Sequence, residues 1–251
     1  MSAGAAGAGL AHSDRDGDVA VGFTDARLDV AESSATGAAH LAVAVDALAG
    51  PSGAGGGAGI RTVRMHQVHG ARVAVIGGDS GLPLEVGMVD GVDALVTAEP
   101  GVALVTRAAD CVPVVLADPG AGVLGAVHAG RAGVVAQVVP AAVAAMRESG
   151  ARRIRAWIGP AVCGGCYEVP ADLREEVAAT VPAARAETTW GTPSLDLVAG
   201  VRSQLAAHGV DEVVDLARCT REDPTLHSYR RDGAAAGRSA GIVVRTSPEV
   251  P

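Results

Sequence analysis

RAADCVPVVLADPGAGVLGAVHAGRAG, residues 107–133, is the stretch that decides the fold. It contains an apolar strand, a tight turn at Asp118-Pro119-Gly120, a second apolar strand and a glycine-rich entry into a helix. Two antiparallel strands joined by a short turn bring their outer ends side by side. Cys111 begins the first strand and His128 ends the second. The pattern therefore predicts that a thiol and an imidazole meet at one end of a hairpin.

Composition limits the classes of function that the chain can have. All 20 basic residues are arginine, which excludes Schiff-base chemistry on lysine and the phosphate-binding lysine of a P-loop. The net charge of -8 argues against a nucleic-acid partner. Uninterrupted apolar runs stay short of the roughly 18 residues that span a membrane. The N-terminus lacks the basic region of a signal peptide, and four cysteines do not make a disulfide scaffold, so we expect a cytoplasmic location.

Many short strand patterns and a few helical ones follow each other without strict alternation. The helical patterns include residues 38–48 and 134–146, and the last strand pattern lies near residues 240–245. This order predicts one α+β domain of layered mixed sheets over residues 19–246. The small and polar residues 1–18 are predicted to form a disordered tail. The segment GPSGAGGGAG at 50–59 contains a formal G-x-G pattern, but no strand precedes it, so we predict a flexible loop there.

His69, Cys111 and His128 are the first candidate site. Two imidazoles and a thiolate suit Zn²⁺ and leave a fourth coordination position open, as a catalytic zinc site requires. The same residues would also serve a nucleophilic site, with Cys111 as thiolate and His128 as its base. Each has a plainer interpretation as well, since Cys111 could be a small core residue and His69 could cap a strand. Spacing alone leaves these alternatives open.

Two carboxylates are candidates for proton transfer. Asp110 precedes Cys111 and would face the opposite side of a regular strand, so its role is catalytic only if the chain turns there, and is otherwise structural. Glu168 follows the sequence Cys163-Gly-Gly-Cys166-Tyr167. That C-x-x-C pair is predicted to have a structural role, with a labile disulfide or half of a metal site as alternatives.

Arginines supply the candidate phosphate contacts, because a guanidinium group binds phosphate through two parallel hydrogen bonds. Arg131 follows the His-Ala-Gly turn, where Gly130 and Gly133 would let backbone N–H groups approach an anion. The other candidates for substrate or phosphate binding are Gln67, Arg230, Arg231 and Arg238.

Eight blocks of the chain, taken in order, resemble the YfiH-like family, which is also called the laccase-domain or purine nucleoside phosphorylase family. They extend over residues 60–245, and their joint occurrence is highly specific. The blocks are HQVHG (66–70), DALVT (93–97), ADCVPVVLAD (109–118), AVHAGRAG (126–133), IGPAVCGGCYEV (158–169), LDL (195–197), CT (219–220) and HSYRRDG with GR (227–238).

The resemblance implies an α+β fold related to cysteine-hydrolase-like folds, with His69, Cys111 and His128 as zinc ligands. It implies phosphorolysis of adenosine, inosine and methylthioadenosine, and deamination of adenosine, so that a nucleoside and phosphate are the expected partners. Older descriptions make the family copper-dependent polyphenol oxidases, and editing of peptidoglycan precursors has also been proposed. A multicopper oxidase would need several more histidines than the two that accompany Cys111, so zinc is the expected metal and copper the alternative.

This chain departs from the family's pattern in two places. Residues 23–42 read FTDARLDVAESSATGAAHLA, where the family carries a T-R-x-G-G-x-S block followed by Asn-Leu. The arginine of the family's HAG-W-R-G turn is replaced by Ala132. Both departures concern substrate or phosphate contacts, so the resemblance transfers the zinc ligands more safely than the purine nucleoside specificity.

Overall fold

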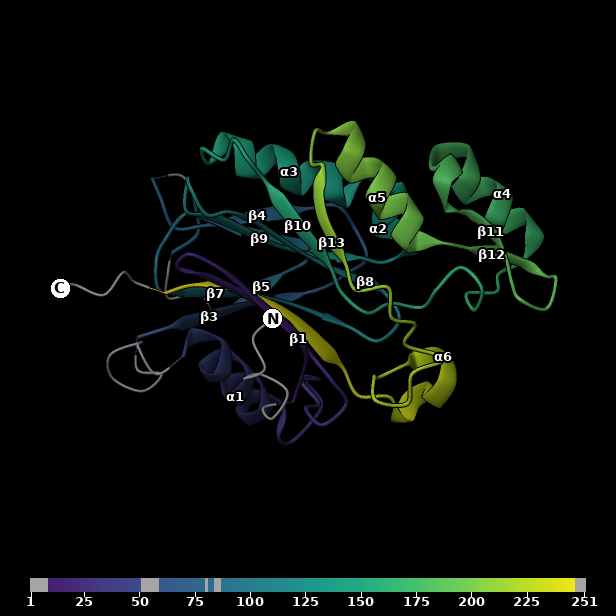
Figure 1. The fold of residues 1–251 in the computed structure, drawn as a ribbon, viewed down its shortest axis with the longest axis horizontal. Helices are drawn as coiled ribbons and strands as arrows, with labels where there is room; N and C mark the ends of the chain where they lie inside the picture. Colours follow the sequence, from purple (N-terminus) through teal and green to yellow (C-terminus); the bar gives the residue numbers. More distant parts are fainter. Residues whose placement is uncertain (1–8, 51–58, 80, 84–86, 247–251) are drawn as a thin grey trace.

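Two six-stranded mixed sheets lie face to face, and helices cover the outer face of each (Figure 1). This computed structural model describes residues 9–50, 59–79, 81–83 and 87–246. The chain is a single α+β domain, as the sequence predicts. Its layers run from one helix through two sheets to a second layer of helices.

The first sheet has the strand order β1-β2-β14-β7-β3-β5, and α1 covers its outer face (Figure 1). Strand β3 pairs in parallel with β7 and β5, and the other neighbours are antiparallel. The bounds are β1 (Leu10–Asp16), β2 (Val19–Thr24), β14 (Ser239–Arg245), β7 (Val102–Ala108), β3 (Arg61–His66), β5 (Met88–Asp90) and α1 (Gly37–Ala49).

The second sheet has the strand order β13-β10-β8-β9-β6-β4, and its outer face lies under α2, α3 and α5. Its bounds are β13 (Glu212–Asp215), β10 (Arg155–Ile158), β8 (Val112–Asp118), β9 (Val123–Ala129), β6 (Ala94–Thr97), β4 (Val73–Ile76), α2 (Arg131–Val135), α3 (Val138–Glu148) and α5 (Leu197–Ala207). Smaller elements flank this half, namely α4 (Ala171–Thr180), β11 (Arg185–Glu187), β12 (Pro193–Leu195) and α6 (Tyr229–Asp232).

Strands β8 and β9 are buried on both faces, which is why their sequence is a continuous apolar run. Val114 and Val127 face the helices, whereas Val115 and Leu124 face the first sheet. Successive side chains of a strand point to opposite faces. His128 therefore points to the same side as Leu124, into the layer between the sheets.

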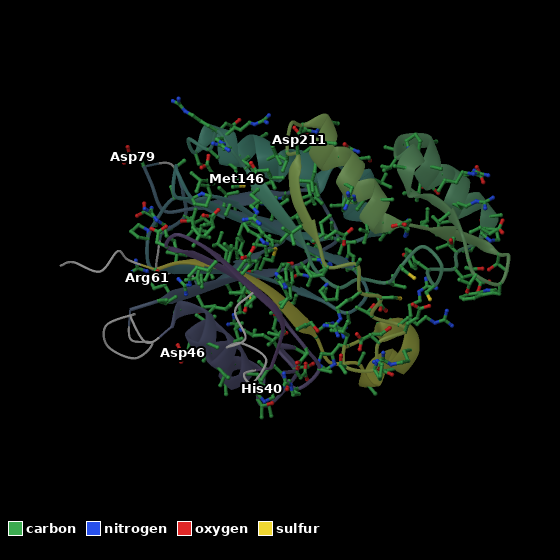
Figure 2. The ribbon with its side chains drawn as sticks, viewed as in Figure 1. His40, Asp46, Arg61, Asp79, Met146 and Asp211 are labelled. Atoms are coloured by element: carbon green, nitrogen blue, oxygen red, sulfur yellow. The ribbon has the colours of Figure 1, made fainter. Side chains whose placement is uncertain are left out.

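Helix α3 packs closely on the second sheet because β9 carries a glycine beneath it. A β-carbon at Gly125 would lie 3.0 Å from the sulfur of Met146. Met146 is fully buried between α3 and the sheet, whereas His40 lies on the opposite side of the molecule, on α1 (Figure 2). Burial of apolar surface at about 25 cal/mol per Å² stabilises these helix–sheet contacts.

The prediction of a disordered tail over residues 1–18 is wrong for residues 10–16, which form strand β1. This polar strand pairs antiparallel with β2, and Asp14 accepts a 2.9 Å hydrogen bond from the indole of Trp157. An edge strand tolerates a polar sequence because one of its sides faces solvent. Residues 1–8, and most of the loop predicted at 50–59, lie outside the described residues.

The helix predicted over residues 134–146 is divided into α2 and α3, with left-handed Gln137 between them. Pro140 lacks the N–H that a continuous helix would donate to the carbonyl of Ala136, and its ring would clash with that carbonyl. In α3, Pro140 falls in the first turn, where a proline is tolerated. Among the described helices, none has the length and apolar character needed to cross a membrane.

Candidate functional site

The hairpin of β8 and β9 brings Cys111 and His128 together. Val112 pairs with Ala129, and Pro113 pairs with His128, so Cys111 at the start of β8 lies next to the end of β9. The prediction from residues 107–133 is confirmed. His69 comes from the loop after β3, where its φ of 61° places it in the left-handed region.

The three side chains form a group that fits a metal ion. Their ligand atoms all lie within 4.8 Å of one another, and Cys111 Sγ is 3.7 Å from His69 Nε2. The rings of His69 and His128 meet edge to face, with centroids 4.7 Å apart. Two imidazoles and one thiol at this spacing could hold a metal ion.

Asp93 fixes the orientation of this group. Its side chain is fully buried just before β6, and its Oδ1 lies 2.9 Å from His128 Nδ1. The same carboxylate accepts hydrogen bonds from the backbone N–H groups of His69 and Gly70. A carboxylate bound to one imidazole nitrogen directs the other nitrogen toward a metal. Asp93 therefore positions both histidines at once.

The electrostatics of the pair favour a thiolate beside an imidazolium. Burial by itself raises the pKa of the Cys111 thiol, but hydrogen bonds and charges from His128 and His69 outweigh it and lower the pKa to about 6. Burial lowers the pKa of His128, but Asp93 and Cys111 outweigh it and raise the pKa to about 9. The Asp93 carboxyl is buried, which raises its pKa, yet the hydrogen bonds from His128 and Gly70 hold that pKa below its ordinary value.

Gly130, at the junction of β9 and α2, leaves room for the metal ligands. Its φ of -75° suits any residue, so the requirement for glycine is steric. A β-carbon there would lie 2.5 Å from His69 Cδ2 and 3.2 Å from Cys111 Sγ. The glycine of the His-Ala-Gly turn therefore allows the backbone to approach the ligands closely.

The metal-ligand group opens into a pocket of about 1020 Å³. Its three arginines, its two tyrosines and one of its two acidic residues line the same pocket as the ligands. They come from strand β7, from the loops after β2 and β10, and from the C-terminal segment 229–238. They are Arg107, Arg230, Arg238, Tyr167, Tyr229 and Glu32. The pocket combines a metal-binding group with aromatic and cationic side chains.

Three of the predicted substrate contacts line this pocket. Gln67 lies in the same loop as His69. Its side-chain amide donates to the carbonyl of Arg107 and accepts a hydrogen bond from the N–H of Arg107. The guanidinium group of Arg230 lies 4.4 Å above the Tyr167 ring and donates to the carbonyl of Glu168. Arg238 also lines the pocket, and its guanidinium donates to the carbonyls of residues 236 and 237.

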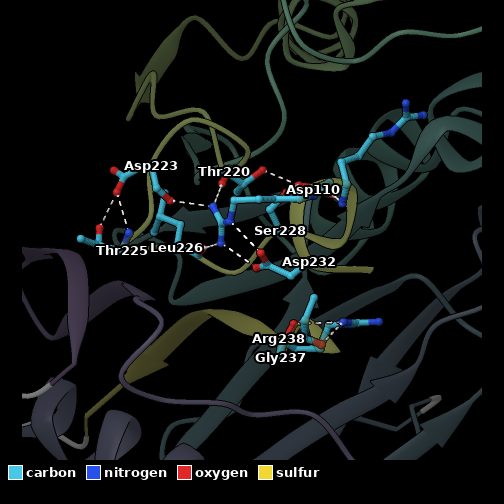
Figure 3. A network of polar contacts seen from close by, with 12 residues as sticks. Asp110, Thr220, Asp223, Thr225, Leu226, Ser228, Asp232, Gly237 and Arg238 are labelled. Atoms are coloured by element: carbon cyan, nitrogen blue, oxygen red, sulfur yellow. Dashed lines mark hydrogen bonds and ion pairs between the residues drawn. The ribbon is translucent and has the colours of Figure 1, made fainter. Parts of the chain in front are cut away.

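Arg131 and Arg231, by contrast, are absent from the lining of this pocket, so their role as phosphate ligands stays a prediction. Arg131 is the first residue of α2 and is half-buried. Arg231 pairs with Asp232 and donates to three backbone carbonyls of the segment 220–226 (Figure 3). The guanidinium group of Arg231 therefore stabilises the fold of segment 220–226.

Asp110 anchors the C-terminal segment to the hairpin. Its φ of 90° turns the chain just before Cys111. Its carboxylate is buried and accepts hydrogen bonds from Thr220 Oγ1 at 2.6 Å, Ser228 Oγ at 2.7 Å and the backbone N–H of Arg230 at 2.6 Å (Figure 3). These contacts occupy the carboxylate and support the structural interpretation of Asp110. Glu168, the second predicted carboxylate, is absent from the pocket lining and binds Trp190.

Sequence reasoning missed the roles of Asp93, Arg107 and Tyr167. The signal for Asp93 was an acidic residue directly before a buried strand, where a carboxylate needs hydrogen-bonding partners. Arg107 pairs with Glu32 and donates to the carbonyl of Met65. No local pattern distinguishes these arginine and tyrosine positions from ordinary surface residues.

The family of multi-copper polyphenol oxidoreductase laccases matches residues 16–246, which include every strand of both sheets except β1. The chain belongs to this family. The resemblance that the sequence blocks indicated, to laccase-domain proteins, is confirmed. In this chain the segment 31–33, within the N-terminal departure from the family's pattern, lines the pocket.

The chain is similar to proteins that carry enzyme names. It is 57% identical over 188 residues to a purine nucleoside phosphorylase of Streptomyces coelicolor, covering 73% of this chain and 74% of that protein. It is 35% identical over 196 residues to an adenosine deaminase from an unknown prokaryotic organism, covering 70% and 72%. The crystal structure of YlmD from Geobacillus stearothermophilus has a TM-score of 0.75 and 28% identity, covering 92% of this chain and 93% of that one.

Proposed function

We propose that this protein is a zinc-dependent purine nucleoside phosphorylase that also deaminates adenosine. The observation that carries the proposal is a three-ligand metal group that faces an arginine-bearing pocket. The names of similar proteins support both activities. The proposed substrates are adenosine, inosine and methylthioadenosine, each with phosphate as the second substrate.

The metal assignment rests on the donor set of His69, Cys111 and His128. Two imidazoles and one thiolate are borderline-soft ligands that zinc binds in open catalytic sites. Only two histidines join a metal-capable group in the described part of the chain, which is too few for a multicopper centre. Bound zinc would act as a Lewis acid toward the substrate or a water molecule.

The pocket residues divide into groups for phosphate and for the base. Arg230 and Arg238 present guanidinium groups whose hydrogen bonds within the chain go to backbone carbonyls, so both retain positive charge for phosphate. Tyr229 is 56% exposed at the pocket and offers an apolar ring on which a purine can stack. In phosphorolysis the C1′–N9 bond breaks, a phosphate oxygen bonds to C1′, and the base leaves with a proton.

The test is turnover of adenosine with and without phosphate, followed by chromatography of the products. We expect adenine and ribose 1-phosphate only when phosphate is present, and inosine from the deaminase reaction without it. The variant Arg230→Ala should raise the KM for phosphate about 10–100-fold, because a hydrogen bond to a charged group is lost. Arg153→Ala, on the surface, is the matched control. Zinc-loaded protein that forms neither product would overturn the proposal.

The role of Asp93 can be tested by zinc affinity. Asp93→Asn should weaken zinc binding about 10–100-fold, because His128 then loses the carboxylate that orients its imidazole ring. Competition with a chromophoric chelator measures the effect. Asp90→Asn is the control, since Asp90 is exposed and ends the neighbouring strand β5. Equal zinc affinity in both variants would show that Asp93 does not position the ligands.

A cysteine-type amidase acting on peptidoglycan precursors is the second candidate. Cys111, His128 and Asp93 are arranged as thiolate, imidazolium and carboxylate, which is the order of groups in a cysteine nucleophile site. This function predicts activity in zinc-free protein and a covalent acyl intermediate on Cys111. Amide turnover that chelators do not reduce would favour it over phosphorolysis.

A further inference from the structure

A second group of metal-ligand side chains lies outside the pocket. Cys163, Cys166, Cys219 and Glu222 place one sulfur or oxygen each within 4.8 Å of one another. We call these four residues the cysteine clamp. The first pair belongs to the loop between β10 and α4, and the second pair follows β13. The clamp therefore joins two segments that are far apart in the sequence.

Each segment forms a turn that directs its two donors to one side. In the first, the carbonyl of Cys163 accepts hydrogen bonds from the N–H groups of Cys166 and Tyr167. In the second, the carbonyl of Cys219 accepts from the N–H of Asp223. Side chains three residues apart on such turns are neighbours, so the sequences C-x-x-C and C-x-x-E each supply a pair of ligands.

The backbone holds the two turns together. Ala161 forms a parallel bridge with Cys219, and the N–H of Thr220 donates to the carbonyl of Ala161 at 3.0 Å. The two turns also contact each other at the proposed ligands. The backbone nitrogen of Cys163 lies 3.4 Å from Cys219 Sγ, and Cys166 Sγ lies 3.3 Å from a carboxylate oxygen of Glu222. In tetrahedral coordination with Zn–S bonds of about 2.3 Å, sulfur atoms lie about 3.8 Å apart. Small side-chain rotations would bring the clamp to that spacing.

We propose that the cysteine clamp is a second zinc site, with a structural role. Three sulfurs and one carboxylate provide four protein ligands, which fills the tetrahedral coordination of a closed site. Binding of Zn²⁺ converts three thiols to thiolates and releases three protons. The resulting centre has a net charge of about −2, and Arg221, which donates to the carbonyl of Cys166, lies beside it.

Zinc accounts for the cluster better than a disulfide does. All four cysteines of the chain are free in the structure. A disulfide would use two of the three clamp thiols and leave the third outside the bridge, and a bridge through Cys166 would also remove the thiol that donates to Glu222. A metal ion uses all four groups, and no oxidant is required.

The clamp supports the wall of the candidate active site. Tyr167 follows Cys166 directly, lines the pocket and carries the guanidinium group of Arg230 on its ring. Thr220 follows Cys219 and donates to Asp110, next to Cys111. A metal bound between the two turns would therefore fix residues on both sides of the pocket.

The test measures metal in the full chain, purified without chelator. We expect two zinc ions per chain in the unaltered protein, one in Cys111→Ala, and one in the double variant Cys166→Ser/Cys219→Ser. Adding Co²⁺ to zinc-free Cys111→Ala should produce a thiolate-to-cobalt charge-transfer band, because the clamp holds all the remaining cysteines. Glu222→Gln keeps the three thiols and should retain the band with weaker Co²⁺ affinity.

Two results would overturn the proposal that the cysteine clamp binds zinc. One is folded, reduced Cys111→Ala that binds no zinc and shows no charge-transfer band. The other is an intact mass lighter by two hydrogens in protein purified without reductant, which assigns a disulfide. Circular dichroism checks the fold of each variant. If the double variant does not fold, the cobalt spectrum of Cys111→Ala decides the question. None of these measurements uses turnover, so their outcome does not depend on whether the protein acts on nucleosides.

Discussion

Cys111 and Cys166 show how far the surroundings of a thiol can change its acidity. For Cys111, burial raises the pKa, but the two histidines outweigh burial and lower it to about 6. For Cys166, burial, Glu222 and Cys163 act in the same direction and raise the pKa to about 12. Since the thiolate is the reactive form, the two cysteines of zinc-free protein should differ strongly in reactivity at neutral pH.

Alkylation by iodoacetamide tests this difference in zinc-free protein. Because Cys111 loses its proton as the pH rises through about 6, its alkylation rate should be half-maximal there and constant above. Cys166 should react slowly throughout the neutral range. Peptide mass mapping separates the two sites.

His128→Gln provides the control for Cys111. Without the imidazolium, the midpoint of alkylation should move to higher pH, toward that of an ordinary thiol. A Cys111 midpoint that is already ordinary in the unaltered chain would contradict the thiolate–imidazolium pair.

At the scale of elements, the junction of β9 and α2 decides whether the ligands can meet. The hairpin positions Cys111 and His128, and the loop after β3 brings His69 across Gly130. The position of His69 relative to the hairpin therefore depends on how closely its loop can approach the backbone of Gly130.

Gly130→Ala should leave the fold intact and damage the metal site. The backbone angle suits alanine, but the added carbon would displace His69 and Cys111. Overpacking costs about 1–3 kcal/mol, so zinc affinity should fall about 5–150-fold. Chelator competition measures the affinity and thermal unfolding checks the fold.

Gly87→Ala is the matched control, because nothing lies within 4 Å of a β-carbon at that position. Unchanged zinc affinity in Gly130→Ala would show that the ligand loop moves freely, against the proposed steric role.

At the scale of the molecule, Asp110 ties the second sheet to the C-terminal segment that completes the pocket. Its three hydrogen bonds come from residues 110–120 positions away in the sequence. Asp110→Ala should lower the free energy of unfolding by about 3 kcal/mol, because buried donors lose a charged acceptor. For a chain of this size the Tm should then fall by about 6–12 °C.

Asp211→Ala, at an exposed position, should leave the Tm unchanged in the same calorimetric experiment. Arg230 would lose its backbone anchor in Asp110→Ala, so the KM for phosphate should also rise. A variant with the Tm of the unaltered protein would show that the C-terminal segment is held by other contacts.

Local patterns predicted most of the elements, and they failed where context decided. The predicted helix 38–48 and last strand 240–245 agree closely with α1 and β14, because buried apolar runs and glycine stops are encoded locally. Strand β1 was missed because its polar residues owe their conformation to pairing with β2. The prediction of a single helix at 134–146 was wrong because Pro140 cannot continue a helix from the turn that precedes it.

The sequence by itself determined the β8–β9 hairpin and the meeting of Cys111 with His128, because a tight turn between two apolar strands fixes which ends are adjacent. Tertiary structure alone decided that Arg230 reaches the pocket while Arg131 does not, and that Asp93 holds both histidines. It also brought Cys219 to Cys163, 56 residues away. Such contacts follow from strand order and sheet stacking, which no local periodicity encodes.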